Sequence, residues 1–283
     1  MMLKLINLAS GLDRLGIGVS RSTWPIIVGG CHRSGTSLIR RILNAHSHIH
    51  CGPEVKFFRD FYGEYLNDPI RHGRFMASAR SVLPEGDLLE VLGRAFVALH
   101  ERAAGRAGKP RWADKNPENV LYLDQWGKLL SDEWLMIHCV RNPLDTLASI
   151  KEVRFPFVIP ADLNARIDFY ERYTRAGLDF GSIHPGRYYR VLYEQLVSSP
   201  RTVLEGMMQW LGEEFEPEQM EFNRFPHQSG LEDPKISDTH EIHSESVGRW
   251  RAILSPEEAL AIRSRTLGLW SLIDPDGRYT ASF

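Results

Sequence analysis

The stretch Ile26–Leu43, "IIVGGCHRSGTSLIRRIL", sets a glycine-rich loop between two apolar segments of different periodicity. Its first four residues follow Pro25 and are too few for a helix, so they predict a short buried strand. After the loop, apolar residues recur at helical spacing through Leu38–Leu43, which predicts an amphipathic helix that begins near Ser34. The local unit is therefore a strand, a glycine loop and a helix.

This loop has the composition of a phosphate-binding loop without the usual lysine. Its two glycines allow tight bends that turn amide groups inward, and the following helix adds its positive N-terminal end. A nucleotide triphosphatase loop carries lysine after its second glycine, where this chain has Thr36. The predicted phosphate ligands are Arg33, Ser34, Gly35, Thr36 and Ser37. The loop suits a compact dianion at the 5′ end of a nucleotide; the alternative is a glycine turn that binds nothing.

The rest of the chain alternates candidate strands with candidate helices. Strands are predicted at residues 111–115, 134–140 and 187–192, and helices at 85–105, 117–130, from 143 onward, 202–211 and 256–269. This order predicts an α/β fold of the P-loop-like, three-layer type, in which helices flank both faces of a central parallel β-sheet. Ligands of such folds bind at the carboxyl ends of the strands, where the glycine loop lies.

The composition is that of an ordinary globular protein. The chain has 283 residues, 43% hydrophobic and 25% charged, with a formal net charge of −2. This balance gives no overall field that would attract nucleic acid, which is therefore not an expected partner. Three cysteines are too few for a disulfide framework, which favours a reducing, cytoplasmic location.

One domain is predicted over residues 24–283, after a separate N-terminal segment of residues 1–23. No apolar stretch reaches the roughly 18 residues of a membrane-spanning helix, and the first residues make a poor signal peptide. Apolar residues between Leu3 and Leu15 recur on one side of a helix. This segment either packs on the domain, which is the preferred interpretation, or lies on a membrane surface.

A second candidate anion site follows the apolar segment 134–140. Arg141 would lie at a strand end, and Asn142 and Pro143 would begin the next helix. Ser149 lies eight positions after Arg141, about two helical turns further on. Arg141 and Ser149 would thereby hold a phosphate on a ribose. The alternatives are an ion pair at a helix terminus for Arg141 and a surface position for Ser149.

The two sites together resemble those of the sulfotransferases that use 3′-phosphoadenosine 5′-phosphosulfate (PAPS). HRSGTSLIRRIL is similar to their 5′-phosphosulfate loop, and VRNPLDTLASI to their 3′-phosphate motif. The likeness is greatest to tyrosylprotein sulfotransferases and their bacterial relatives, whose loop and helix precede a CGEE segment. Here that segment is CGPE, residues 51–54. Similarities at DKNP, YEQLV and SVGRW extend the resemblance over residues 25–251 in the same order.

The resemblance implies a transferase that moves a sulfuryl group from PAPS to a hydroxyl acceptor, without a metal. Sugars, lipids, small phenols and peptide tyrosines are all open as acceptors, and a homodimer is also left open. The resemblance also implies in-line attack with Glu54 as general base, since a carboxylate beside the sulfuryl group can take the hydroxyl proton. Pro53 and Lys56 depart from the family pattern. This departure puts peptide recognition in doubt more than catalysis.

Three further residues take roles from the resemblance. Lys115 would neutralise the departing phosphate oxygen, Tyr193 would lie near the nucleotide, and Arg249 would end a loop that closes over PAPS. From the residues alone, a solvated lysine before a helix is the favoured interpretation of Lys115, and a buried core tyrosine is the alternative for Tyr193. Contacts within residues 234–250 stay unassigned.

A run of histidines, His46, His48 and His50, raises the question of a metal site. No second ligand pair with metal spacing follows, so a polar loop without metal is predicted. Two other functions remain as alternatives: a nucleotide-binding protein without transfer activity, and a metal-dependent small-molecule kinase. Thr36 disfavours the kinase, because it stands where a kinase-type loop needs lysine.

Overall fold

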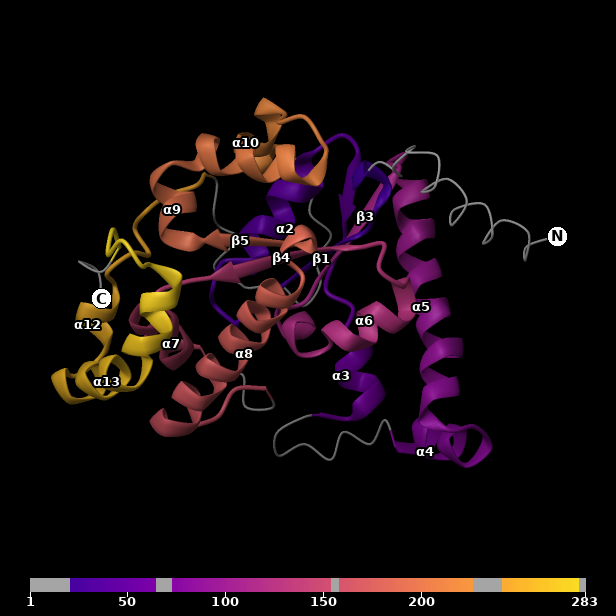
Figure 1. Ribbon diagram of the computed structural model, residues 1–283, viewed down its shortest axis with the longest axis horizontal. Coiled ribbons are helices and arrows are strands. Elements are labelled where there is room, and N and C mark those ends of the chain that lie inside the picture. The colour runs from indigo at the N-terminus through magenta and orange to yellow at the C-terminus, as the bar shows by residue number, and fades with distance from the viewer. Residues whose placement is uncertain (1–20, 65–72, 154–157, 226–240, 280–283) are drawn as a thin grey trace.

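The computed structural model describes residues 21–64, 73–153, 158–225 and 241–279 (Figure 1). Its centre is a five-stranded sheet of order β2-β3-β1-β4-β5, in which every neighbouring pair is parallel. The strands are β1 (Ile26–Gly30), β2 (Ile49–Cys51), β3 (Arg111–Lys115), β4 (Leu135–Val140) and β5 (Tyr188–Leu192). The parallel sheet that the alternating pattern predicts is confirmed.

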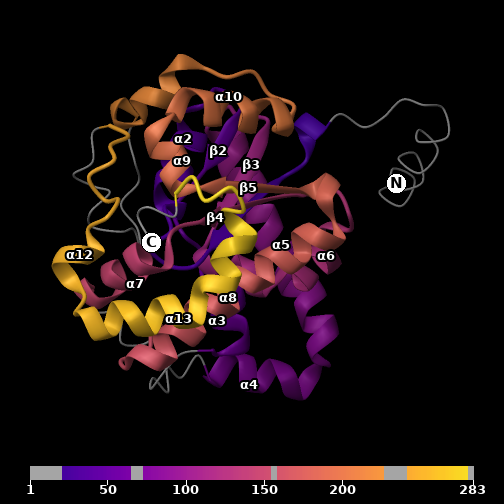
Figure 2. The same cartoon turned by 60° about the vertical axis from the view of Figure 1, so that its left-hand side comes forward.

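Helices cover both faces of the sheet, which gives the predicted three layers (Figures 1 and 2). Ile26 and Val28 of β1 join the core on one face, and Ile27 joins the core on the other. The first core includes residues of α2 (Thr36–Ala45), α9 (Tyr193–Ser198) and α10 (Pro200–Leu211). The second includes residues of α3 (Phe57–Tyr62), α4 (Gly73–Val82), α5 (Glu85–Arg106), α6 (Leu123–Leu130), α7 (Pro143–Glu152), α8 (Leu163–Ile183) and α13 (Pro256–Ile273). Because both faces are covered, the strands are apolar on both sides.

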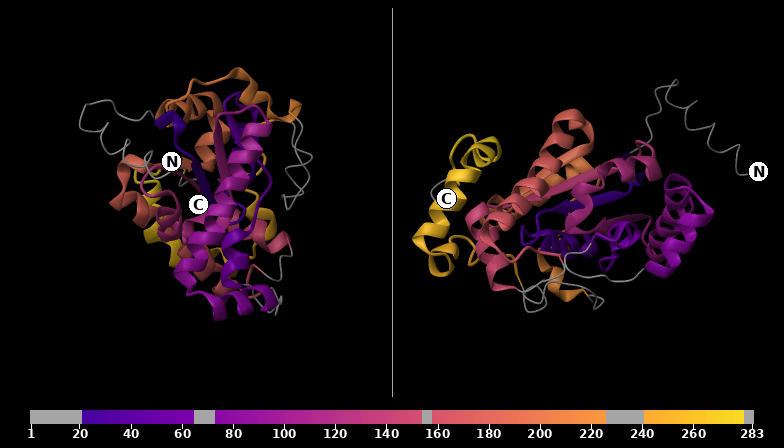
Figure 3. Two further views of the ribbon diagram at one scale, coloured as in Figure 1. Left: turned by 90° about the vertical axis from the view of Figure 1, so that its right-hand side faces the viewer. Right: turned by 90° about the horizontal axis from the view of Figure 1, so that it is seen from below.

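Two long helices lie at the two ends of the molecule. Seen from below, α5 and α13 lie at opposite ends (Figure 3), and the short α12 (Trp250–Ile253) precedes α13. Within the described ranges, no helix is long and apolar enough to cross a membrane. Of the N-terminal segment, only Arg21–Thr23 is described, as the 3-10 helix η3. The apolar stripe predicted there lies outside the described residues, and the domain boundary stays a prediction.

Two departures from the predicted helices have local reasons. The helix after the loop begins two residues later than expected, at Thr36, because Gly35 has a left-handed backbone with φ 93°. The helix predicted over residues 117–130 is two elements, the 3-10 helix η4 (Pro117–Leu121) and α6. They are separate because the backbone at Tyr122 leaves the helical region, with φ −123° and ψ 28°.

The long helix α8 was not predicted at all. Its buried face is formed by Ile167, Tyr170, Tyr173, Thr174 and Gly177, so it lacks a plain aliphatic stripe. Gly177 is required for packing: a Cβ there would lie 2.4 Å from the imidazole of His138 in β4. Tyrosine, threonine and glycine score low for hydropathy. The buried face of α8 therefore does not appear in the sequence as a helical repeat of apolar residues.

The carboxyl ends of β1, β3 and β4 bring three predicted sites to one edge of the sheet. Val28 is aligned with Lys115 across β1 and β3, and Gly30 with Cys139 across β1 and β4. At Gly30 a Cβ would lie 2.2 Å from the Cys139 carbonyl oxygen, so this position requires glycine. The glycine loop, Lys115 and Arg141 therefore share one edge, as expected for ligand sites of this fold.

Candidate active site

The loop after β1 contains two residues with left-handed backbones. Arg33 has φ 70° and Gly35 has φ 93°. A Cβ at position 35 would lie 2.7 Å from the ring of Tyr193, so glycine is needed for space as well as for conformation. Arginine rarely adopts this conformation, so the surrounding structure must hold Arg33 in place.

The three hydroxyl residues of the loop differ in their contacts. Ser34 is buried, and its hydroxyl donates to the Cys31 carbonyl at 2.6 Å. Thr36 is also buried and begins α2. Ser37 is half-buried, and its hydroxyl accepts from the Lys115 ammonium at 3.1 Å. Ser34 therefore braces the loop, and Ser37 joins it to β3.

Four predicted donor-site residues from separate segments meet beside the loop. Arg33 Nε donates to the Ser149 hydroxyl at 3.0 Å. Arg141 donates to the carbonyls of Arg33 at 3.0 Å and of Ser246 at 2.5 Å, and its guanidinium lies 4.6 Å from the centre of the Tyr193 ring. These partners are neutral, and among the described residues the buried Arg141 Nε has no hydrogen-bond partner. Two guanidinium groups in this setting suit an anion.

A buried ion pair lies on the other side of Ser37. The Lys115 side chain, fully buried at the end of β3, contacts the Glu54 carboxylate. Lys56 lies 2.5 Å from Glu54 and 3.1 Å from Glu118. Burial raises the pKa of Glu54, but Lys115 and Lys56 outweigh it and lower that pKa to about 2. Glu54 is therefore a carboxylate at neutral pH, held between two ammonium groups.

The segment that carries Glu54 is fastened from two sides. Arg40 of α2 donates to the carbonyls of residues 51 and 52 at 3.4 and 3.2 Å. The Asn44 side chain accepts from the amide of residue 51 at 3.1 Å, and Asn116 donates to the carbonyl of residue 55 at 3.0 Å. Sequence reasoning missed these residues. A buried arginine on an apolar helix is the signal that could have identified Arg40, because buried charges need specific partners.

Glu118 extends the charged network away from the loop, and it too was missed. It lies 3.6 Å from Arg59 and 3.8 Å from His32. Arg59 donates in turn to the Tyr173 hydroxyl at 3.1 Å. Burial, and then nearby Lys56, lower the pKa of His32 well below its ordinary value, so this imidazole is neutral. The base candidate thus borders a larger network in which charges are paired.

The sequence model of the sulfotransferase family matches residues 25–217. This chain is a member of the sulfotransferase family. A Caenorhabditis briggsae protein with the provisional name protein-tyrosine sulfotransferase is 26% identical to it over 192 residues, 66% of this chain. The chain spans 64% of the length of that relative. Family membership and the likeness to a tyrosylprotein sulfotransferase agree with the resemblance found in the motifs.

Two solved sulfotransferase domains share the fold. The domain from the Synechococcus PCC 7002 olefin synthase superposes with a TM-score of 0.61 at 22% identity, over 84% of this chain and 92% of that domain. The domain from the curacin biosynthetic pathway gives a TM-score of 0.59 at 18% identity, over 86% and 96%. These similarities confirm the predicted P-loop-like fold.

In this member of the family, the side chain of Arg249, the last predicted donor-site residue, has an acidic partner. Its guanidinium pairs with Glu152 at 3.1 Å. The adjoining backbone is held by Asp145, which accepts from the amides of residues 248 and 250 at 2.7 and 3.0 Å. Residues 234–240 lie outside the described ranges. The structure therefore links Arg33, Arg141, Ser149 and Tyr193 by contacts, and it pairs Arg249 with Glu152.

Glu194 is a buried carboxyl that sequence reasoning did not single out. One of its oxygens accepts from the Asn142 amide at 3.0 Å, and the other has no hydrogen-bond partner in the described part of the chain. Burial raises the pKa of Glu194 to about 7, although this hydrogen bond and Arg141 act in the opposite direction. Glu194 thus holds the turn from β4 into α7, directly behind Arg141.

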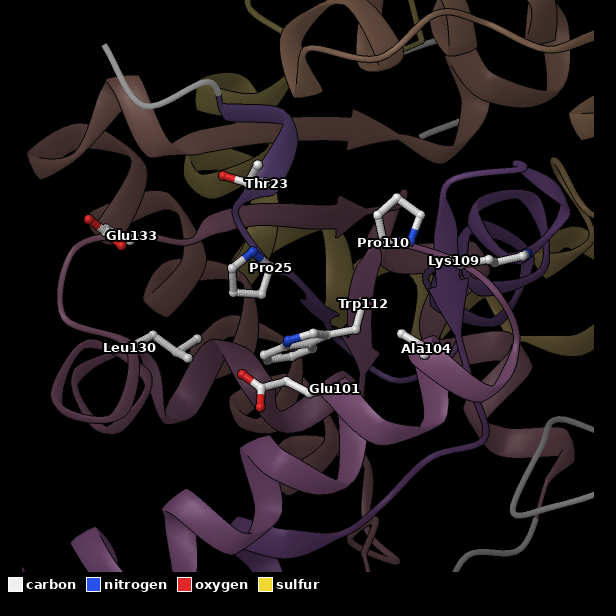
Figure 4. A pocket seen from close by; sticks show the side chains of 10 residues that line it. Thr23, Pro25, Glu101, Ala104, Lys109, Pro110, Trp112, Leu130 and Glu133 are labelled. Carbon is white, nitrogen blue, oxygen red and sulfur yellow. The ribbon is translucent and has the colours of Figure 1, made fainter. Parts of the chain in front are cut away.

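A cavity of about 450 Å³ lies at the other end of the strands (Figure 4). Pro25, Pro110 and Glu133, near the starts of β1, β3 and β4, line it together with Trp112 and Glu101. The candidate active site lies at the carboxyl ends of these strands. The cavity is therefore separate from the residues described above.

Proposed function

We propose that this sulfotransferase moves a sulfuryl group from PAPS to a hydroxyl group of its acceptor. The observation that carries the proposal is a juxtaposition at one edge of the sheet. The arginine cluster of Arg33 and Arg141 lies on one side of the loop, and the pair of Lys115 and Glu54 on the other. Ser37 of the loop contacts Lys115. The cluster suits the anionic groups of a donor, and the pair suits proton transfer and charge stabilisation.

The residues present fit the donor at both of its anionic ends. Arg141 and Ser149 would hold the 3′-phosphate. Within the described part of the chain the Arg141 Nε has no hydrogen-bond partner, which supports this assignment because a phosphate oxygen would satisfy it. The amides of the loop and the N-terminus of α2 would hold the 5′ group. Arg33, whose side chain donates to Ser149, would lie between the two ends. When bound, PAPS supplies the sulfuryl group, and adenosine 3′,5′-bisphosphate is its leaving group.

Glu54 would accept the proton of the attacking hydroxyl. It is ionised at neutral pH and its side chain is only 10% exposed, but two lysines make it a weak base. An anion that draws Lys115 toward the loop would weaken one of these contacts and raise the pKa of Glu54. The carboxylate would then become a stronger base when the donor is in place.

Lys115 would stabilise the negative charge that develops on the departing oxygen. Its ammonium already contacts the loop at Ser37, and its side chain is fully buried, so the cation acts where water is excluded. Together with Arg33 and the loop amides, it supplies a positive field at the loop. We therefore propose that transfer requires no divalent metal.

Binding and transfer experiments test this proposal against its alternatives. We expect the full chain to bind PAPS in the presence of EDTA, as measured by calorimetry, and ATP with Mg²⁺ not to compete. Mass spectrometry across sugars, lipids, small phenols and tyrosine peptides then detects an acceptor that gains one SO₃ group. PAPS binding without transfer to any acceptor would favour a nucleotide-binding protein. Phosphoryl transfer from ATP and Mg²⁺ would favour a kinase.

The cytoplasmic location stays a prediction from the sequence, and the identity of the acceptor and a homodimer stay open. Lys56, where the resembled family usually has arginine, contacts both Glu54 and Glu118. This departure from the family therefore acts directly on the base. For this reason the acceptor panel extends beyond peptide tyrosines.

A further inference from the structure

Two histidines and a glutamate meet at the far end of α2 from the glycine loop. His46 follows α2, His48 directly precedes β2, and Glu213 lies two residues after α10. One ligand atom of each residue lies within 4.8 Å of the others. Because α2 has ten residues and a helix rises 1.5 Å per residue, about 15 Å of helix separates this cluster from the loop. The cluster is therefore distinct from the candidate active site.

His46 is buried and its ring is oriented by the backbone. Its Nε2 lies 2.9 Å from the carbonyl of Glu214, which is an acceptor, so Nε2 carries the proton. Its Nδ1 is then unprotonated and accepts from the amide of His48 at 3.1 Å. Metal-binding histidines commonly donate their second ring N–H to a carbonyl in this way. Both nitrogens of His46 are therefore engaged, and a metal ion would have to replace the hydrogen bond that Nδ1 accepts from the His48 amide.

Glu213 is held through one of its two carboxylate oxygens. Its side chain is 6% exposed, and Oε1 accepts from buried Arg111 at 3.1 Å. The other oxygen, Oε2, lies 3.1 Å from Nδ1 of His48. His48 itself is 60% exposed, so the cluster is open to solvent on one side. Contacts with the surrounding chain therefore orient His46 and Glu213, and one ligand atom of each of the three residues lies within 4.8 Å of the others.

We propose that His46, His48 and Glu213 bind a transition-metal dication, with Zn²⁺ as the expected ion. Two neutral imidazoles and one carboxylate are donors that Zn²⁺ accepts, whereas Mg²⁺ and Ca²⁺ take oxygen ligands. A water molecule would complete the shell on the exposed side of His48. Binding replaces the bond from the His48 amide to His46 and the contact between His48 and Glu213.

The ion would join two segments that are distant in the sequence. The turn between α2 and β2 already contacts the chain after α10, where the Ser47 amide donates to Glu216 at 2.7 Å. A metal bound between His48 and Glu213 would strengthen this junction. Because about 15 Å of helix separates the cluster from the loop, loss of the ion should lower stability rather than sulfuryl transfer.

The test uses the purified full chain, stripped with a chelator and titrated with Zn²⁺ against a chromophoric competitor. We expect one ion per chain and a rise in the midpoint of thermal unfolding. His48→Ala changes an exposed side chain and is expected to weaken Zn²⁺ binding by more than about tenfold and to abolish the rise. His50→Ala, in the same run but outside the cluster, is the matched control and should bind Zn²⁺ like the wild type.

A second variant and a second readout keep the test decisive. Glu213→Gln retains an acceptor for Arg111 but removes the charge, and it should also weaken binding. With Co²⁺ in place of Zn²⁺, the visible spectrum should show the absorption of Co²⁺ at low coordination number. We expect this absorption in the wild type and in His50→Ala, but not in His48→Ala or Glu213→Gln. Absence of Zn²⁺ binding in the wild type, or equal affinity in wild type and His48→Ala, would overturn the proposal. No readout requires sulfuryl transfer, so this result is independent of the proposed function.

Discussion

The two sides of the glycine loop hold their cations in different ways. Arg141 contacts two carbonyl oxygens and an aromatic ring, whereas Lys115 contacts a carboxylate and a hydroxyl. A phosphate can replace neutral partners without leaving a buried charge unpaired. Moving Lys115 away from Glu54 changes the charge balance of a buried acid. The first arrangement therefore suits binding, and the second suits chemistry.

Glu54→Gln should show the largest effect and tests the chemical side. Glutamine keeps the size of the side chain but cannot accept the proton, so turnover should fall by about 10² to 10⁴. PAPS affinity should change little. Initial rates on an alcohol acceptor and calorimetric titration with PAPS measure the two quantities. The fall should be smaller for an acidic phenol, which ionises with less help.

The control for this variant is Glu133→Gln, which removes a carboxylate at the opposite end of the strands. It should retain full turnover. If Glu54→Gln is as active as the wild type on an alcohol acceptor, the base lies elsewhere and the comparison between the two sides fails.

Arg141→Ala tests the binding side, with a smaller expected effect. PAPS affinity should weaken by roughly 1.5–3 kcal/mol, the contribution of a charge-assisted hydrogen bond. Adenosine 5′-phosphosulfate, which lacks the 3′-phosphate, should lose far less. Arg249→Ala is the comparison variant, because Arg249 pairs with Glu152 and should contribute less to affinity. Equal losses for both nucleotides would remove Arg141 from the 3′ site.

Glu194→Gln tests the buried carboxyl beside Arg141 through the pH dependence of stability. The pKa of Glu194 is raised by burial from 4.5 to about 7. The protonated form therefore stabilises the fold at low pH, and this contribution is lost as the pH rises through about 7. Between pH 5 and pH 8 the wild type should lose roughly 2–3 kcal/mol of unfolding free energy relative to Glu194→Gln. Urea unfolding at several pH values measures this difference, and parallel curves for the two proteins would contradict it.

Chelation should have the smallest effect on turnover. EDTA is expected to leave sulfuryl transfer unchanged, since Arg33, Lys115 and the loop amides supply the positive field. With Zn²⁺ bound at His46 and His48, EDTA should instead lower the midpoint of thermal unfolding. Transfer assays and thermal unfolding on the same samples distinguish the effect of EDTA on the candidate active site from its effect on the histidine cluster. Activity that disappears with EDTA and returns with Mg²⁺ would point to the kinase.

Local patterns indicated the residues of the binding side, and the family resemblance then assigned them to a donor, which stays a proposal. The loop is bounded by a strand and a helix that are contiguous in the sequence, and Arg141 directly follows an apolar strand. Ser149 lies on the helix that follows, and in the structure its hydroxyl accepts from Arg33. Because parallel strands share a carboxyl edge, the two segments meet without further information. The chemical side needed the family resemblance, since spacing alone does not distinguish Glu54 from a surface glutamate.

The rest depends on contacts between distant segments. Glu118 contacts Lys56 across 62 residues, and Glu213 contacts His48 across 165. No periodicity links such pairs, so neither the charged network nor the histidine cluster was predicted. The histidine run was expected to be a polar loop because its third candidate ligand lies in another part of the chain. Folding, through the packing of α2 against the sheet and α10, brings them together.

Arg33 shows what this loop costs the protein. With φ 70°, it holds a conformation that costs an L-residue roughly 1–2 kcal/mol and glycine almost nothing. A chain selected only for folding would carry glycine at this position. This chain instead keeps the side chain that reaches Ser149. The carbonyl that accepts from Arg141 belongs to the backbone, so glycine would also supply it. A substitution of Arg33 by glycine would therefore relieve backbone strain, but it would also remove a cation from the proposed donor site.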